Sequence, residues 1–271
     1  MTTGTLRKLV SNLSDTVEYK LPVGEELVDL NSLLEKPLTL NFTGNIFCSN
    51  CGNKTNKSFS QGYCFPCMRK LARCDMCIVK PETCHYHQGT CREPEWGEQN
   101  CFIPHYVYLS NTSGLKVGIT RHSQIPTRWI DQGATQATLM FKVGTRQLSG
   151  FVETAFKDLI ADKTNWRAML KGDADPVDLN AEAEQLKSKL SQTINSLITT
   201  HSEEQIETVE SGITNINYPV VQHPVKITSH NFDKNPVVSG TLMGIKGQYL
   251  IFDSGVINIR KFTSYEVSVD C

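Results

Sequence analysis

The stretch His105-Tyr106-Val107-Tyr108-Leu109 turns through Ser110-Asn111-Thr112-Ser113-Gly114 and resumes as Leu115-Lys116-Val117-Gly118-Ile119-Thr120. Two short runs of β-branched and aromatic residues, joined by a small polar loop that contains a glycine, are typical of a β-hairpin. This hairpin decides the fold of the middle of the chain, because the segments after it can be arranged around it.

Those following segments predict a helix, a strand and a second helix. Residues 123–133 favour a short helix, with Pro126 in its first turn and Gly133 at its C-terminal cap. Residues 138–143 are predicted to form a third strand. In the next segment apolar side chains recur at helical spacing, so we expect an amphipathic helix with Glu153 at the border of its apolar stripe.

This order of elements, with a tyrosine on the hairpin and an arginine and a glutamate on the helices, resembles the GIY-YIG endonuclease superfamily. Tyr106-Val107-Tyr108 resembles the GIY triplet, and Lys116-Val117-Gly118 resembles the YIG triplet. The resemblance implies a catalytic set of Tyr108, Lys116, Arg128 and Glu153. It also implies a divalent ion, Mg²⁺ or Mn²⁺, held by Glu153 at the scissile phosphate, while Arg128 balances the phosphate charge.

Two positions depart from the superfamily's pattern. Tyr106 stands in place of the first glycine of GIY, and Lys116 stands in place of the tyrosine of YIG. A lysine can still contact a phosphate as a point charge, so binding can persist where cleavage does not. A late asparagine near the metal is also typical, and Asn165 is a candidate. In the structural alternative, the tyrosine packs in the core and Arg128 pairs with Glu153.

Nine of the ten cysteines lie between Cys48 and Cys101, in repeated Cys-x-x-Cys pairs that indicate metal binding in a reducing compartment. The first two pairs are Cys48 with Cys51 and, twelve residues later, Cys64 with Cys67. Two such knuckles at this separation are typical of a tetrahedral zinc ribbon. We expect this zinc site to be structural.

A second group of cysteines follows at once. Cys74 and Cys77 form a third knuckle that needs two more ligands, and Cys91 and Cys101 are favoured, with Cys84 next. His85 and His87 are also eligible donors. Four thiolates can equally hold an iron–sulfur cluster, and a redox-active thiol pair is a third interpretation.

A second resemblance runs through most of the chain. Residues 57–64, 80–85 and 89–97, together with 128–134 and 162–167, resemble an uncharacterised bacterial zinc-binding family of unknown function. It implies no activity.

Composition and charge narrow the class of protein. The chain has 271 residues, 39% of them hydrophobic, and a formal net charge of −1, so an ordered, multi-domain protein is expected. Nine basic residues against four acids in residues 112–171 favour an anionic ligand, whereas nine acids against two lysines in 172–212 suit a solvated helix. The start of the chain lacks a signal peptide and no segment suits a membrane span, which predicts a cytoplasmic location.

We therefore predict an α+β, multi-domain protein. Its first three expected parts are a β-rich segment (1–47), a zinc-binding region (48–101) and a GIY-YIG-like module (102–171). An acidic helical segment (172–216) and a small C-terminal β-barrel of OB or SH3 type (217–271) follow.

The function expected from these parts is that of a nucleic-acid-binding zinc protein, with DNA or RNA as partner and no small-molecule cofactor. Whether it is also a divalent-metal-dependent endonuclease stays open. The alternatives are a non-catalytic zinc adaptor for DNA or RNA, and a metal or redox sensor that uses the surplus cysteines.

Overall fold

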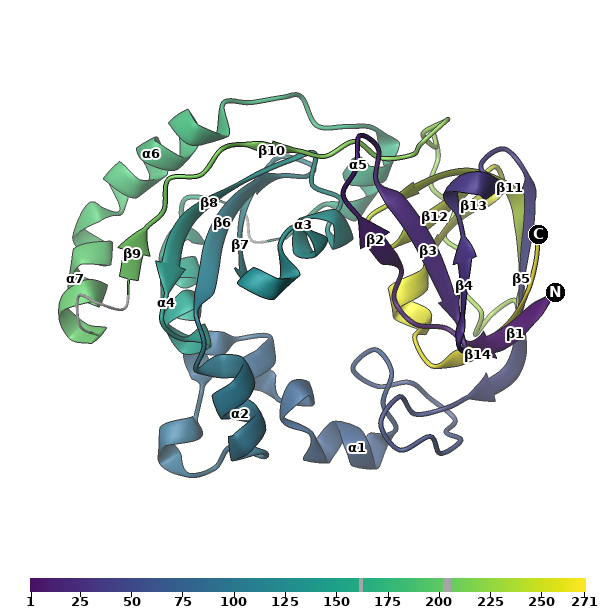
Figure 1. Cartoon of the computed structure of the whole chain (residues 1–271), viewed down its shortest axis with the longest axis horizontal. Coiled ribbons are helices and arrows are strands. Elements are labelled where there is room, and N and C mark those ends of the chain that lie inside the picture. Colours follow the sequence, from purple (N-terminus) through teal and green to yellow (C-terminus); the bar gives the residue numbers. More distant parts are fainter. Residues whose placement is uncertain (161–162, 202–205) are drawn as a thin grey trace.

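A computed structural model describes residues 1–160, 163–201 and 206–271. Two β-rich parts face each other, and the Cys-rich region connects them (Figure 1). Asp162, part of one motif quoted above, lies outside the described residues, as do Glu203 and Glu204 of the acidic segment. The mixture of helices and strands agrees with the predicted α+β class.

The middle of the chain forms an antiparallel sheet around the predicted hairpin. Strand β6 (His105–Asn111) pairs with β7 (Leu115–Arg121), and Tyr108 lies opposite Gly118. Strand β8 (Gln136–Val143) pairs with the other side of β6. Two short strands, β9 (Ile206–Thr208) and β10 (Thr214–Asn215), add to β8, which leaves β7 as an edge strand. The hairpin and the third strand are thus confirmed.

Side chains alternate along the strands of this sheet, so apolar residues point to both of its faces, and helices cover each face. On one face lies α3 (Thr127–Asp131), whose Trp129 and Ile130 share a core with Tyr108. On the other face lies α4 (Arg146–Phe156), capped by the Thr145 side chain. Three helices follow α4 along the described chain: α5 (Trp166–Lys171), α6 (Leu179–Lys189) and α7 (Ser191–His201).

The two ends of the chain share one open sheet. It has the order β1-β14-β5-β11-β12-β13, and its strands are β1 (Thr2–Thr5), β14 (Tyr265–Asp270), β5 (Pro37–Ile46), β11 (Val237–Lys246), β12 (Tyr249–Phe252) and β13 (Gly255–Asn258). A three-stranded sheet, made of β2 (Val10–Asn12), β3 (Glu18–Val23) and β4 (Glu26–Asp29), contributes to the same core.

The predicted C-terminal β-barrel is therefore wrong. Strand β14 pairs with β1 and β5, and β11 pairs with β5, so backbone hydrogen bonds that would close a local barrel go to the N-terminal strands. Among the described residues the sheet remains open. Strands β11 to β14 form where the sequence predicts strands, whereas the strands predicted at 220–221 and 225–227 do not form. Of these four, β11 and β14 have partners from the other end of the chain.

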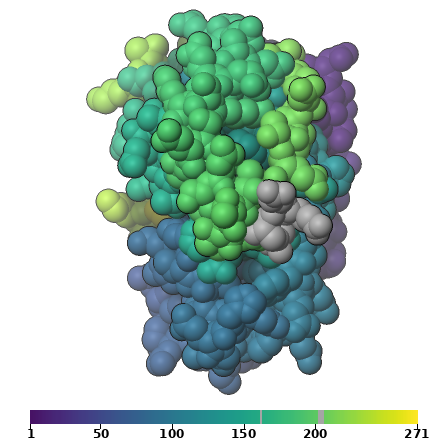
Figure 2. Space-filling model, turned by 90° about the vertical axis from the view of Figure 1, so that its left-hand side faces the viewer, coloured from purple at the N-terminus to yellow at the C-terminus, as the bar shows by residue number. Residues whose placement is uncertain are grey.

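The Cys-rich region contains little regular structure. Its two short helices are α1 (Phe65–Lys70) and α2 (Pro94–Cys101), joined by single 3₁₀ turns. Figure 2 shows this region in blue, forming the lower part of one face beneath the green helices. Among the described residues, no helix combines the length and the apolar character that crossing a membrane requires.

Candidate zinc cluster and cationic cleft

Four thiols converge at the first pair of knuckles. The sulfur atoms of Cys48, Cys51, Cys64 and Cys67 all lie within 4.8 Å of one another, and the Sγ atoms of Cys51 and Cys64 are 3.8 Å apart. Thiolates about 2.3 Å from a zinc ion at the corners of a tetrahedron lie ~3.8 Å apart. The cluster is therefore compatible with structural zinc.

Local backbone geometry holds these thiols in place. The first knuckle closes because Gly52 N–H donates to the Cys48 carbonyl at 2.9 Å, and Cys48 N–H donates to Asn53 at 2.9 Å. The second knuckle begins at Cys64, the residue that caps α1. Burial opposes ionisation of Cys48, but the backbone N–H groups of Cys51, Cys64 and Asn50 together lower the pKa of its thiol to about 6. Such donors favour the thiolate form that binds metal.

The structure separates the remaining cysteines into two places. Cys77, Cys84, Cys91 and Cys101 line one small cavity, whereas Cys74 lines a different and larger one. His85 lies beside the first cavity, where it approaches Asp75. His87 contributes its ring to an aromatic contact with Phe102.

The larger cavity is a cationic cleft of about 790 Å³ at the edge strand β7. Its walls come from four parts of the chain: Arg7 and Lys8, residues 49–81 of the Cys-rich region, residues 119–153 of the central sheet and its helices, and the 3₁₀ turn η8 (Ile259–Phe262) with Thr263. Among the described residues that line it, seven are basic and two are acidic, a surplus of five positive charges: Arg7, Lys8, Arg73, Arg121, Arg128, Arg146 and Arg260, against Asp75 and Glu153.

Neutral acceptors orient three of the arginines. Arg121 donates to the Asn100 side-chain oxygen at 2.7 Å, and Arg146 donates to the Ile78 carbonyl at 2.6 Å. Arg260 donates to the side-chain oxygen of Gln61 at 2.6 Å. Because these acceptors carry no formal charge, they fix the guanidinium groups without neutralising them.

Mutual repulsion shows how closely these cations are gathered. Burial lowers the pKa of Arg146 and nearby Cys101 and Cys77 raise it, while the charges of Arg128 and Arg121 lower it. Burial also lowers the pKa of Arg260, and Arg128 again contributes in the same direction although Asp131 opposes it. Arg128 therefore lies within electrostatic reach of both walls of the cleft. An anion bound there would relieve this repulsion.

The structure brings together part of the predicted catalytic set. Arg128 and Glu153 both line the cleft. Tyr108 is fully buried and its hydroxyl donates to the Gln132 side chain at 2.7 Å. Burial raises the pKa of Tyr108, while nearby Arg128 lowers it and Glu153 raises it further, so this tyrosine lies close to both cleft residues.

The other two candidates lie near the tip of the hairpin. Lys116 is buried, and its Nζ is 3.4 Å from the Thr164 hydroxyl. Asn165 caps α5 by accepting from Ala168 N–H at 3.2 Å, and its own N–H donates to Ser113 at 2.9 Å. The α5 region covers this end of the hairpin, so the structure does not bring these two residues into the cleft.

Sequence reasoning missed four of the seven basic residues of the cleft. Arg7, Lys8, Arg73 and Arg260 come from segments far apart in the chain, and none of them lies in a motif. No local pattern could have identified them, because only the packing of the two chain ends against the Cys-rich region brings them together.

These features define an α+β protein in which a four-cysteine cluster, compatible with structural zinc, borders an arginine-rich cleft. Residues 35–267 match the family described as protein of unknown function (DUF2797), so the chain belongs to that family. This match confirms the predicted membership of an uncharacterised family. No curated protein and no solved structure matches the chain.

Proposed function

We propose that the protein binds nucleic acid through the phosphate backbone in its cationic cleft. The observation that carries the proposal is the surplus of five positive charges among the residues that line one cavity. Arginine and lysine contacts to phosphates supply most of the affinity of non-specific nucleic-acid binding. Tyr63, also in the wall, offers an aromatic ring for base stacking.

In this proposal the zinc ion has a structural role. Ser49, Gln61 and Tyr63 line the cleft from the segments between the four zinc-cluster cysteines. Gln61 in turn holds Arg260 in place. A zinc ion at the cluster would therefore fix one wall of the binding site and take no part in chemistry.

The test measures binding of labelled single-stranded and duplex DNA and RNA across a range of salt concentrations. We expect Arg128→Gln to weaken binding by roughly tenfold, which corresponds to ~1.4 kcal/mol. It should also lower the slope of log affinity against log salt by about 0.7 to 0.9, as the loss of one phosphate contact requires.

The matched control is Lys189→Gln, which removes one positive charge from the exposed end of α6. It should leave binding unchanged. If it weakens binding as much as Arg128→Gln does, the interaction is a diffuse charge effect and the cleft is not the site. If the wild-type protein binds none of the four nucleic acids, the proposal is wrong.

A second candidate function is metal-dependent cleavage of the bound strand, and the presence of both Arg128 and Glu153 in the cleft favours it. Glu153 would hold the divalent ion, which supplies charge stabilisation at the phosphate when bound. Arg128 would balance the phosphate charge. Tyr108, buried behind Arg128 with a raised pKa, suits the orientation of Arg128 better than proton abstraction.

Cleavage is tested by incubating the same nucleic acids with magnesium or manganese. Glu153→Gln should abolish cutting and retain binding, and Tyr108→Phe should reduce cutting less severely. Salt-dependent binding without cutting by the wild type would identify a non-catalytic adaptor. That result would remove the endonuclease and leave the binding proposal intact.

A further inference from the structure

The four cysteines that line the small cavity, Cys77, Cys84, Cys91 and Cys101, occupy a part of the chain that has almost no core of its own. None of the described residues 48–106 belongs to one of the three hydrophobic core clusters. Within 72–102 the backbone runs through single 3₁₀ turns and one short helix. Segments of this kind usually depend on disulfides or bound metal for a fixed structure. The zinc cluster of Cys48–Cys67 lies before this segment, which therefore needs a second anchor.

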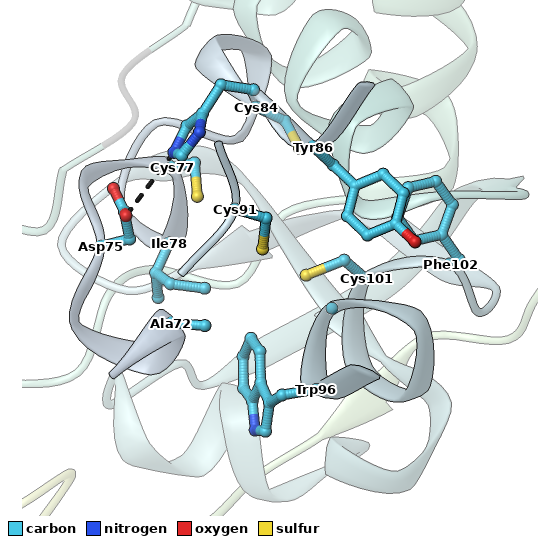
Figure 3. Close-up of a pocket in the computed structure, with 12 residues that line it drawn as sticks. Ala72, Asp75, Cys77, Ile78, Cys84, Tyr86, Cys91, Trp96, Cys101 and Phe102 are labelled. Carbon is cyan, nitrogen blue, oxygen red and sulfur yellow. Dashed lines mark ion pairs between the residues drawn. The ribbon is translucent and has the colours of Figure 1, made fainter. Parts of the chain in front are cut away.

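The four thiols surround the space where such an anchor would sit. Cys77, Cys84, Cys91 and Cys101 come from three separate turns and the end of α2, and all four line the same cavity (Figure 3). The rings of Tyr86, Trp96 and Phe102 enclose them and restrict the access of water.

The neighbouring oxygen and nitrogen donors already have partners. Asp75 accepts from Met76 N–H and forms an ion pair with Arg92 at 2.6 Å. His85 Nδ1 is 2.7 Å from the Thr90 hydroxyl, and the other ring nitrogen, Nε2, is 3.5 Å from an Asp75 carboxylate oxygen. These contacts hold Asp75 and His85 around the thiols as an outer layer, so the sulfur atoms are the ligands on offer.

The four sulfurs of this cavity are less tightly grouped than those of Cys48, Cys51, Cys64 and Cys67. Among the described residues, the groups of three or more donors that all lie within 4.8 Å of one another are the zinc cluster and the set of Asp75, Cys77 and His85. No three of the four thiols in this cavity therefore meet that limit. One zinc ion would draw its ligands to about 3.8 Å from each other, whereas a cluster binds each thiolate to a different iron.

We propose that Cys77, Cys84, Cys91 and Cys101 hold a [4Fe–4S] cluster. The four thiolates, one for each iron, are the usual ligand set of such a cluster. Cys74 is not a ligand, because it lines the cationic cleft on the other side of the turn.

The cluster also supports one wall of the cationic cleft. The turn η4 (Pro81–Thr83) packs directly on Gly150 of α4, where a side chain would lie 2.6 Å from the backbone N of Glu82. Arg146 and Gln147, in the first turn of α4, donate to the carbonyls of Ile78 and Cys84. The turns that carry the ligands therefore position the helix that carries Arg146 and Glu153.

The test is the metal content of the full chain, purified anaerobically and reconstituted with ferrous iron and sulfide. We expect about four iron and four acid-labile sulfide per chain, with about one zinc ion and the visible absorption of a cluster. Cys91→Ser should lose iron, sulfide and absorption while keeping the zinc. Cys51→Ser should do the reverse.

Two controls keep the assignment falsifiable. Cys74→Ser and Cys271→Ser should retain the full iron and sulfide content, since neither residue lines the small cavity. If Cys74→Ser loses the cluster, the ligand set is wrong. Two zinc ions and no iron after reconstitution would show a second zinc site, and one zinc ion alone would show no second metal. Both results overturn the proposal, and neither depends on nucleic-acid binding.

Discussion

Gly150 is the position at which one methyl group should separate the Cys-rich region from α4. An ideal Cβ there would lie 2.6 Å from Glu82 N and 2.7 Å from Pro81 Cβ. An ordinary contact begins near 3.4 Å, so the η4 turn would have to move by about 0.8 Å. The neighbour is backbone, which cannot rotate away as a long side chain does.

Two effects of opposite sign decide the size of the change in Gly150→Ala. In the middle of a helix, alanine stabilises relative to glycine by about 1 kcal/mol. Overpacking against a rigid neighbour destabilises by about 1–3 kcal/mol. The clash involves both backbone and Pro81, so we expect its upper range and a net loss of ~1–2 kcal/mol in the free energy of unfolding.

Urea unfolding of wild type and variant, with metals bound, measures this change. Hydrogen exchange should show the loss concentrated in η4 and the first turns of α4. The matched control is Gly172→Ala, because Gly172 has extended backbone and nothing within 4 Å of its Cβ position. That control should be neutral or stabilising by up to about 1 kcal/mol. The reasoning fails if Gly150→Ala is as stable as Gly172→Ala.

Three further predictions concern pH, a buried charge and the zinc cluster. Burial lowers the pKa of His105 to about 4 from 6.5, so the unfolded chain binds the extra proton between these values. As the pH falls from 6.5 to 4, the free energy of unfolding of the wild type should therefore decrease by about 3 kcal/mol more than that of His105→Gln. If the free energies of the two proteins change in parallel with pH, the prediction is wrong. Lys246 is fully buried and its ammonium is 2.6 Å from Asp173. Asp173→Asn should therefore lower the free energy of unfolding by ~1–3 kcal/mol, measured in urea. The control Asp175→Asn changes an exposed carboxylate and should leave that free energy unchanged. Cys64→Ser should release the zinc and increase proteolysis between residues 46 and 67, with a zinc-sensitive dye as the readout; retained zinc would show that the cluster is not its site.

Local signals in the sequence were enough to predict the β6–β7 hairpin and helix α4. The hairpin depends on alternating apolar side chains and a glycine-containing loop, and α4 depends on a stripe with helical period, both of which are properties of neighbouring residues. The four-cysteine cluster was predictable for the same reason, since each knuckle requires two cysteines three residues apart. Cys48 and Cys64 are brought together by a loop of only twelve intervening residues after Cys51.

Long-range pairing was beyond the reach of the sequence. Strand β5 pairs with β14 and β11, which lie about two hundred residues further along the chain. The same period-two pattern suits a local barrel and a sheet shared by both chain ends, so the pattern could not choose between them. Lys116 was ambiguous in a similar way, because only the packing of Thr164 against the hairpin shows where its side chain goes.

The arrangement of charge in the cleft argues for a ligand more strongly than any single residue does. Arg146 lies within electrostatic reach of Arg128 and Arg121, and burial adds to the cost of keeping it charged, although Cys101 and Cys77 act in the opposite direction. Among the described residues that line the cleft, two carboxylates stand against seven basic side chains, whereas the buried Lys246 elsewhere has Asp173 beside it. An excess of one sign of charge in the wall of a cavity is typical of binding sites, where the ligand supplies the opposite charge. The cleft walls come from both chain ends and from the segments around the cysteines, so the open sheet and the four-cysteine cluster both help to hold these like charges together. In the proposed function, a bound polyanion would supply the opposite charge.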